Sequence, residues 1–361
     1  MRLLALTKSG PLAASTRQRF IQYEPTLAEA GIEVTYSPLL DDAHVQRVAN
    51  GKRASPVAVA IAYARRLKDL ISARRFDALW IHCELFPYLP SGFERLAFLH
   101  AKPIIFDYDD AIFHMYDRSG RGLVRSLLGV KLAPLIRGSA AVCSGNDYLR
   151  DYAAQYNDKV VILPTVVDTD RYRPGAEHDE RPVTIGWIGS PSTWAFVRPI
   201  LPILADLCRD RGVRFTAVGA GPGATSDQFE GMTAVPWSED SEIAAVQAMD
   251  IGIMPLPDAP WARGKCGYKL IQYMACGLPV VASPVGVNSD IVEVGVSGFL
   301  ATDTEQWRTA LTRLIDDPAL RAAMGAAGRR RAVEAYSLQA HAPRLVEIMR
   351  GAVGAKGRTT P

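Results

Sequence analysis

The sequence predicts an α/β fold made of two doubly wound, Rossmann-like domains that face a central cleft. Short apolar runs of strand type alternate with longer helical segments along most of the chain, and such alternation is typical of parallel sheets with right-handed crossovers. The chain has 361 residues, which is more than one core usually fills. The polar, proline-bearing segment at residues 165–182 separates two such series and is typical of a linker.

We therefore expect an N-terminal domain over residues 1–170 and a C-terminal domain over residues 171–338. A last helix over residues 339–355 is expected to pack back on the first domain. Doubly wound sheets bind ligands outside the carboxyl ends of their strands. The cleft between the two domains is accordingly the expected site.

The elements follow from the apolar pattern. In the first domain we expect strands at Leu3–Thr7, Ile32–Tyr36, Ala78–His82, Pro103–Phe106, Ala140–Cys143 and Val160–Leu163, with helices that include Ser15–Gly31 and Pro56–Arg75. In the second we expect strands at Val183–Ile188, Arg214–Val218, Ile251–Pro255, Pro279–Ala282 and Gly298–Ala301, with helices at Trp194–Arg209, Ser241–Met249, Thr304–Asp316, Pro318–Tyr336 and Gln339–Arg350.

The composition is that of a globular protein, with 48% hydrophobic and 22% charged residues. No apolar run approaches the roughly 18 residues of a membrane span, and the apolar start at Leu3–Leu6 is too short for a signal peptide. We therefore expect a cytoplasmic protein. The five cysteines are scattered without a C-x-x-C pair, so neither a metal nor a disulfide framework is expected.

The net charge is only +3, but basic residues cluster. Residues 46–76 carry eight cations and one acid, and residues 118–146 carry five cations and no acid. The segment at residues 121–138 interleaves its cations with Leu and Val at helical spacing. Such a helix either lies on an anionic membrane surface or is simply a solvated helix face. No basic-aromatic pattern of nucleic-acid binding is present.

The segment SGPLAASTRQRF, residues 9–20, follows the first strand. Gly10 can make a tight turn there. Arg17 and Arg19 lie in the first helical turn, where acids are favoured. An ordinary strand-to-helix turn and an anion-binding turn both fit.

The segment FDYDDAIF places Asp107, Asp109 and Asp110 at the carboxyl end of a strand, and Glu84 follows the strand before it. Such acids repel one another unless something compensates. Binding of an acceptor hydroxyl, Mg²⁺ binding and helix capping remain alternatives.

The segment IGWIGSPST ends a strand at Gly189 and Ser190, whose turn can meet a phosphate or can be an ordinary turn. The most informative segment is residues 264–300. There Lys265 and Lys269 are four residues apart and can point the same way, which suits a diphosphate.

In the same segment Gln272 lies on the side of the helix that carries Lys269. The turn through Val287, Asn288, Ser289 and Asp290 begins another helix, with Ser289 as the expected cap. Its N–H groups and the side chain of Asn288 can hold polar ligand atoms.

Residues 264–300 resemble the donor-binding region of family-4 glycosyltransferases of GT-B fold, through YMACGLPVVAS, VGVNSD and SGFL. SGNDYLRDYAAQY, ILPTVVDTDRYRP and FTAVGAGP are also similar to segments of that family. The chain departs from the family at Gln272 and Gly264, where the family has glutamates that contact the donor. It also lacks the family's cations after Gly189, so that Arg263, Lys265 or Lys269 would bind the diphosphate instead.

The resemblance implies a retaining, metal-independent transfer from a UDP- or GDP-type nucleotide sugar, with no cofactor besides that donor. Asp109, Lys265 and Lys269 are the expected catalytic residues, because the lysines can stabilise charge on the leaving diphosphate. The other expected donor-binding residues are Gly10, Gly189, Ser190, Arg263, Gln272, Val287, Asn288, Ser289 and Asp290. The expected acceptor-binding residues are Arg17, Arg19, Glu84, Asp107 and Asp109.

The hypothesis is thus a glycosyltransferase of bacterial polysaccharide or glycolipid assembly, with a carbohydrate or lipid-linked acceptor and peripheral contact with the inner membrane face. A GT-B epimerase or hydrolase and a non-catalytic nucleotide-sugar-binding scaffold are the alternatives.

Overall fold

The computed structural model describes residues 1–49, 55–176 and 181–354. The chain divides into two compact units. The first contains Met1–Thr165, the short segment Gly264–Cys266 and the chain from His341 onward, and the second contains Val166–Arg263 and Gly267–Ala340. Among the described residues, no helix has both the length and the apolar character that crossing a membrane requires.

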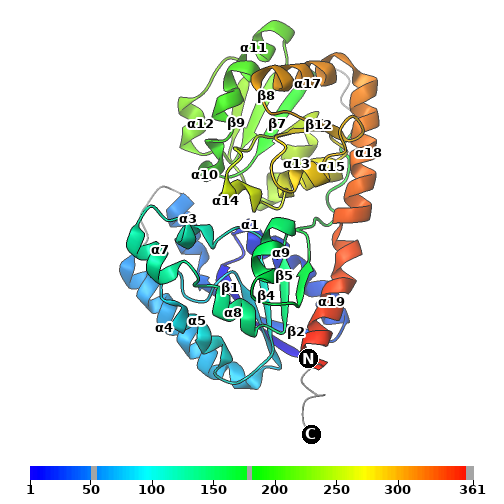
Figure 1. Cartoon of the computed structure of the whole chain (residues 1–361). Coiled ribbons are helices and arrows are strands. Elements are labelled where there is room, and N and C mark those ends of the chain that lie inside the picture. Colours follow the sequence, from blue (N-terminus) through cyan, green and yellow to red (C-terminus); the bar gives the residue numbers. More distant parts are fainter. Residues whose placement is uncertain (50–54, 177–180, 355–361) are drawn as a thin grey trace. The chain divides into compact units, whose positions relative to one another are not determined.

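The first unit is built on a six-stranded parallel sheet with helices around it (Figure 1). In spatial order its strands are β2 (Glu33–Leu40), β1 (Arg2–Ser9), β3 (Ala78–His82), β4 (Ile104–Tyr108), β5 (Ala141–Ser144) and β6 (Val160–Ile162). Its helices are α1 (Ala14–Arg19), α2 (Glu24–Glu29), α3 (Asp42–Ala49), α4 (Pro56–Ser72), α5 (Ser91–Glu94), α6 (His114–Asp117), α7 (Gly122–Leu128), α8 (Ala133–Gly138), α9 (Asp147–Ala154) and most of α19 (Leu338–Gly354).

The second unit repeats this plan with another six-stranded parallel sheet. Its strands are β12 (Gly298–Leu300), β11 (Val280–Ala282), β10 (Ile251–Met254), β7 (Thr184–Ile188), β8 (Arg214–Val218) and β9 (Met232–Val235). Its helices are α10 (Pro191–Trp194), α11 (Leu201–Arg211), α12 (Pro222–Ser226), α13 (Glu239–Gln247), α14 (Pro260–Arg263), α15 (Tyr268–Ala275), α16 (Asn288–Ile291), α17 (Thr304–Asp316) and α18 (Pro318–Tyr336).

The cores form where apolar strand residues meet apolar helix faces. In the first sheet Leu3, Trp80 and Phe106 are fully buried on neighbouring strands. In the second, Ile185 and Phe215 lie on paired strands and belong to one buried cluster. Strands buried on both faces account for the continuous apolar runs in the sequence, and the expected α/β class with two doubly wound sheets is confirmed.

Several expected elements are shorter or interrupted. The single helix expected at Ser15–Gly31 is wrong, because the chain forms α1, a short 3₁₀ turn at Ile21–Tyr23 and then α2 with Pro25 in its first turn. The helix expected at Trp194–Arg209 is likewise replaced by α10, a 3₁₀ turn at Arg198–Ile200 and α11. Strand β9 was not predicted, because it is a short edge strand with two exposed residues and lacks a continuous apolar run.

The basic segment at residues 121–138 does not form the single amphipathic helix that its spacing suggested. It forms α7 and α8, and Pro134 lies in the first turn of α8. Arg121 and Arg125 are exposed, whereas Lys131 is only 1% exposed. Lys131 therefore contributes to the interior and not to a basic surface.

Candidate functional site

Several of the expected site residues lie at the carboxyl edge of the first sheet, at the ends of β3 and β4. Strands β3 and β4 pair with His82 opposite Asp107, and the backbone N–H of Cys83 donates to the carbonyl of Asp107 at 2.8 Å. The residues that follow the two strands are therefore neighbours, as expected for parallel strands.

Asp107 and Arg19 form a buried ion pair. Both side chains are 0% exposed, and the guanidinium donates from Nε at 2.8 Å and from Nη2 at 3.0 Å to the two carboxylate oxygens. Nη1 of Arg19 also donates to the carbonyl of Leu163 at 2.6 Å. Although burial opposes the charged form, Asp107 outweighs it and raises the pKa of Arg19. These two residues, expected on the acceptor side, lie inside the unit and bind each other.

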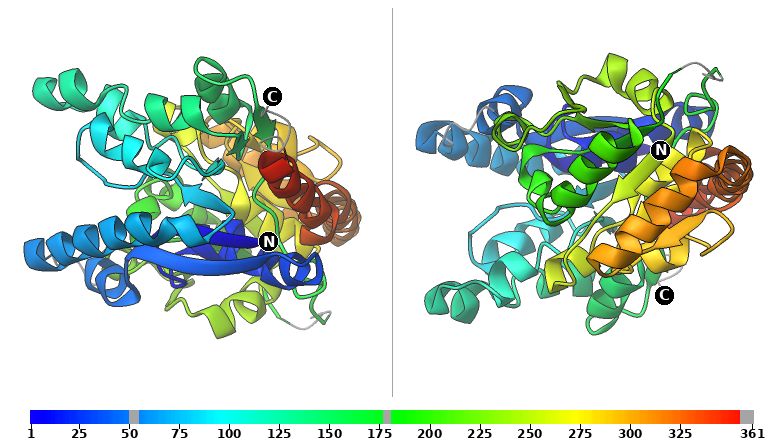
Figure 2. Two further views of the ribbon diagram at one scale, coloured as in Figure 1. Left: turned by 90° about the horizontal axis from the view of Figure 1, so that it is seen from below. Right: turned by 90° about the horizontal axis from the view of Figure 1, so that it is seen from above.

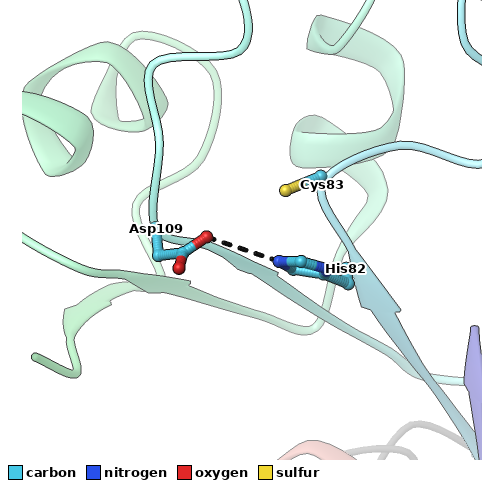
Figure 3. A group of neighbouring side chains, drawn as sticks. All are labelled: His82, Cys83 and Asp109. Carbon is cyan, nitrogen blue, oxygen red and sulfur yellow. Dashed lines mark hydrogen bonds and ion pairs between the residues drawn. The ribbon is translucent and has the colours of Figure 1, made fainter. Parts of the chain in front are cut away.

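Asp109 and Asp110 lie on the loop after β4 and have different partners. His82 Nε2 lies 3.4 Å from Asp109 Oδ1, with 2% and 14% of the two side chains exposed (Figure 3). Burial opposes ionisation of Asp109, but the hydrogen bond from His82 and the charges of His82 and Arg19 outweigh it and lower the pKa of Asp109. Asp110 Oδ1 accepts from Lys265 Nζ at 2.8 Å.

Sequence reasoning missed His82, which lies at the last position of β3. Its signal was available, since the carboxyl ends of adjacent parallel strands meet at one edge. His82, Cys83 and Asp109 each offer one possible ligand atom, and these atoms lie within 4.8 Å of one another (Figure 3). Burial raises the pKa of the Cys83 thiol well above its usual value, so the thiol of the metal-free protein is protonated at neutral pH.

Glu84 belongs to a buried network that fixes the loop after β3. Its carboxylate accepts from Tyr116 Oη at 2.6 Å and lies 3.3 Å from Lys8 Nζ and 3.7 Å from Lys131 Nζ. Lys131 also pairs with Glu94, whose other partners are the N–H groups of Leu85 and Phe86.

Cys83 and Tyr88, at the two ends of this loop, have φ of 63° and 61°, a conformation that costs non-glycine residues energy and that surrounding contacts must enforce. The loop is held rigidly beside Asp109.

The remaining residues of the first unit are placed as follows. Gly10 lies in the β1–α1 turn, where an added Cβ would come 2.4 Å from Asp42 Oδ1. Arg17 donates from Nη1 to the carbonyls of Pro11 and Leu12, both at 2.9 Å. Arg17 thereby contributes to the same turn.

The prediction that Lys265 and Lys269 lie four residues apart on one helix is wrong. Helix α15 begins at Tyr268, after Gly267 with φ of 65°, so that Lys265 lies before the helix. The segment Gly264–Cys266 instead groups with the first unit. Asn146 Nδ2 donates to the carbonyl of Lys265 at 3.0 Å, and Cys266 Sγ donates to the carbonyl of Asp109 at 3.0 Å.

Gly264 has a steric reason to be glycine. An added Cβ would lie 2.5 Å from Ala111 Cβ and 2.8 Å from its backbone nitrogen. A glutamate therefore does not fit at this position without moving the loop after β4.

In the second unit, Lys269 and Gly189 lie together at the carboxyl end of β7. Lys269 Nζ is 5.8 Å from the centre of a Trp187 ring, a distance at which a cation is attracted by an aromatic face. An added Cβ on Gly189 would lie 2.9 Å from Lys269 Cε. Ser190 then caps the short helix α10 through a reciprocal pair of hydrogen bonds with Thr193.

Gln272 is only 2% exposed. Its Nε2 donates to Glu242 Oε1 at 2.8 Å and to Tyr172 Oη at 3.2 Å. Glu242 also accepts from Tyr172 Oη and Trp237 Nε1. A carboxylate is thus present beside Gln272, but it comes from α13.

The turn before α16 differs from expectation in its cap. Val287, and not Ser289, is the N-cap residue, and Ser289 and Asp290 are exposed. Asn288 is fully buried and its Nδ2 donates to the carbonyl of Ser283 at 3.1 Å, whereas its Oδ1 has no hydrogen-bond partner among the residues that the structure describes. Arg263 pairs with Asp258 at 2.7 Å, and about half of its side chain is exposed.

Residues 183–317 match the family model of the glycosyl transferases group 1. The chain is 31% identical over 179 residues, 49% of its length and 37% of the relative's, to D-inositol 3-phosphate glycosyltransferase from Thermobispora bispora. It is 28% identical over 244 residues, 58% of its length and 62% of the relative's, to alpha-maltose-1-phosphate synthase from Mycolicibacterium smegmatis. The chain thus spans less than two thirds of the length of these curated relatives.

Solved structures resemble the chain over almost its whole length. The structure of Anabaena Alr3699/HepE in complex with UDP-glucose superposes with a TM-score of 0.74 and 16% identity. The match covers 97% of this chain and 99% of the HepE chain. Sucrose-phosphate synthase from Thermosynechococcus elongatus covers 98% with 100% of its own, at a TM-score of 0.73 and 15% identity. The GT-B fold is therefore confirmed.

Proposed function

We propose that this chain is a glycosyltransferase that moves a sugar from a nucleotide-diphosphate sugar to an acceptor hydroxyl with retention of configuration, as in family 4. The match of residues 183–317 to the glycosyl transferases group 1 carries the proposal. The position of Lys269 beside Gly189 at the carboxyl end of β7 supports it, because ligands of doubly wound sheets bind at that edge. HepE, which was solved with UDP-glucose, supports a UDP-type donor.

The proposed donor chemistry rests on a cation next to a tight backbone turn. Cleavage of the sugar–phosphate bond leaves negative charge on the departing diphosphate. Lys269 would stabilise this charge as it develops. Lys265 would contribute only by exchanging Asp110 for a phosphate, because Asp110 now holds its ammonium group at 2.8 Å.

The proposed acceptor chemistry rests on Asp109. Its lowered pKa keeps the carboxylate ionised at neutral pH, and an ionised carboxylate can accept a hydrogen bond from an attacking hydroxyl. His82 and the rigid loop after β3 would hold it in position. We propose a carbohydrate or lipid-linked acceptor, and a peripheral contact with an anionic membrane for which the exposed Arg121 and Arg125 provide charge.

The test is a screen of UDP- and GDP-sugars by thermal shift, followed by an assay of nucleotide release with and without acceptors. A ligand that binds only the folded state raises the melting temperature. Lys269→Ala should lower the transfer rate about a hundredfold, as the loss of one charge-stabilising group does. Lys159→Ala, at an exposed position, is the control and should retain the wild-type rate.

An unchanged rate and donor affinity in Lys269→Ala would refute the proposed donor site. Nucleotide release that needs no acceptor would instead identify a hydrolase, and binding of a nucleotide sugar without any turnover would identify a non-catalytic scaffold. The anomeric configuration of the product, read by NMR, tests retention separately.

A further inference from the structure

Helix α4 has an unusual distribution of side chains. Its inward face buries Ala62 and Leu70 and also carries Arg66, which is 1% exposed and donates to the carbonyls of Thr7 at 2.7 Å and Ser37 at 3.0 Å. Its outward face carries Val57, Ile61, Leu67 and Ile71, which are 69%, 62%, 41% and 56% exposed. The outward face of a surface helix is usually polar, so these exposed apolar side chains are the unusual feature.

These four residues, here called the apolar face of α4, form one stripe. Their spacing of three or four residues, together with Ala64 between them, places them on one side of the helix. All exposed large apolar side chains of the described chain, except Val294, Val296 and Val333, lie between Val57 and Val130. Concentration of this kind marks a contact surface and not random surface composition.

The charge around the apolar face is almost entirely positive. Between residues 55 and 138 the exposed cations are Arg65, Lys68, Arg74, Arg75, Arg95, Arg118, Arg121, Arg125 and Arg137. Asp77 is the one exposed acid in that range, and its carboxylate accepts from the N–H of Arg2 at 2.7 Å. Asp69, the acid of α4 itself, is half-buried and bonded to Ser37.

Helices α4 (blue) and α7 (teal) project from the same side of the first unit (Figures 1 and 2). Leu123 and Leu127 of α7 are 73% and 60% exposed and alternate with Arg121 and Arg125. One side of the unit therefore combines apolar side chains with cations.

We propose that the apolar face of α4 docks on an anionic lipid bilayer, with Arg74 and Arg75 at the level of the headgroups. Lys68 lies within the stripe and reaches the headgroups with its long side chain. Helices with one apolar face and flanking cations bind such surfaces by burying apolar area and by attraction to anionic lipids. A second copy of the chain fits less well, because a symmetric contact would bring two basic surfaces together. The inference rests on the proposed peripheral membrane contact and assigns that contact to α4.

The test is flotation with vesicles of equal parts phosphatidylcholine and phosphatidylglycerol, compared with phosphatidylcholine alone. The wild type should float only with the anionic vesicles, and added salt should release it. Ile61→Glu with Ile71→Glu should weaken binding at least about tenfold, since two apolar side chains no longer enter the interface. Lys68→Glu with Arg74→Glu should weaken it about fivefold or more.

Val333→Glu, an exposed apolar position of α18 in the second unit, is the matched control and should bind as the wild type does. The thermal shift by donor nucleotide should be unchanged in all variants, so that loss of docking is separated from loss of the folded donor site. Circular dichroism verifies that each variant is folded.

The inference would be overturned if both α4 variants bound the vesicles as the wild type does while Leu123→Glu with Leu127→Glu did not bind. That result would assign the membrane contact to α7. If the wild type did not float with anionic vesicles, both the docking of α4 and the proposed membrane contact would be overturned. Dimers in lipid-free solution that Ile61→Glu converts to monomers would show that a second copy covers the face, which also overturns the inference. The thermal shift by donor nucleotide tests the proposed donor site separately, so its result does not depend on the outcome of the flotation experiments.

Discussion

Asp109 differs from the two aspartates next to it in how its charge is balanced. Asp107 is held by two hydrogen bonds from Arg19, and Asp110 is held by Lys265 at 2.8 Å. Asp109 has a longer contact, 3.4 Å, with His82. Of the three acids, Asp109 is therefore the one whose oxygen atoms are least committed to a strong partner, which suits contact with a substrate hydroxyl.

The pH dependence of stability tests the charge state of Asp109. Its pKa is lower in the folded state, so between the folded value and the unfolded value of about 3.9 the unfolded chain binds more protons. The ionised group stabilises the fold above that window and loses this effect as the pH falls through it.

Asp109→Asn should lower the free energy of unfolding by about 1–2 kcal/mol at pH 7, and the difference from the wild type should shrink below about pH 4. Urea unfolding at a series of pH values measures both quantities. A difference that stays constant down to pH 3 would show that the charge of Asp109 is not what matters.

Several helices and strands of both units begin and end where the sequence predicted. Strands Ala78–His82 and Arg214–Val218 and helices Thr304–Asp316 and Pro318–Tyr336 have the expected bounds. Short apolar runs define the strands, and the capping residues Asp303 and Asp317 mark where the two helices begin. The interruption between α7 and α8 was not predicted, although Gly129 at the end of α7 and Pro134 in the first turn of α8 are local signals for it. The position of Lys131 beside Glu84 and Glu94 could not be predicted, because local spacing does not report tertiary contacts.

Two helical glycines give opposite predictions for the same substitution. An added Cβ on Gly325 of α18 would lie 2.0 Å from the carbonyl oxygen of Gly277, whereas one on Gly351 of α19 meets nothing within 4 Å. Gly351→Ala should stabilise the protein by about 0.5–1 kcal/mol through helix propensity. Gly325→Ala should destabilise it by about 1–3 kcal/mol, because backbone must move.

Thermal or urea unfolding of the two variants gives the comparison directly, and each serves as the control for the other. Stabilisation by Gly325→Ala would mean that α18 and the end of α15 pack less closely than described. The pattern also shows why a glycine inside a predicted helix cannot be interpreted from sequence alone.

The sequence predicted which residues lie at the carboxyl edges of the two sheets, but it did not predict which side chains these residues contact. Asp109, Asp110 and Gly189 follow predicted strands, so their position at the carboxyl edge of a sheet could be predicted. The separation of Lys265 from α15 depends on Gly267 and on the close approach of Gly264 to Ala111. The pairing of Gln272 with Glu242 joins residues 30 positions apart, and only the fold brings them together.

The five thiols, shared between the two units, test the burial of both cores in one experiment. Cys83, Cys143, Cys208 and Cys276 are buried, and Cys266 is partly buried. Burial raises the pKa of Cys208 to about 11 and that of Cys276 to about 12, and it raises the pKa of the other three as well. At pH 8 the reactive thiolate should therefore be about one part in a thousand or less at each site.

We expect a disulfide reagent at pH 8 to label the native protein very slowly and to label five thiols rapidly in denaturant. Peptide mass spectrometry across a urea series then assigns each labelled thiol, with Cys83 and Cys143 reporting on the first unit and Cys208 and Cys276 on the second. Rapid labelling of Cys143 or Cys276 in the native protein would contradict the described cores. Because a buried thiol becomes reactive only when the sheet around it opens, the urea concentration at which each pair is labelled measures the stability of its unit.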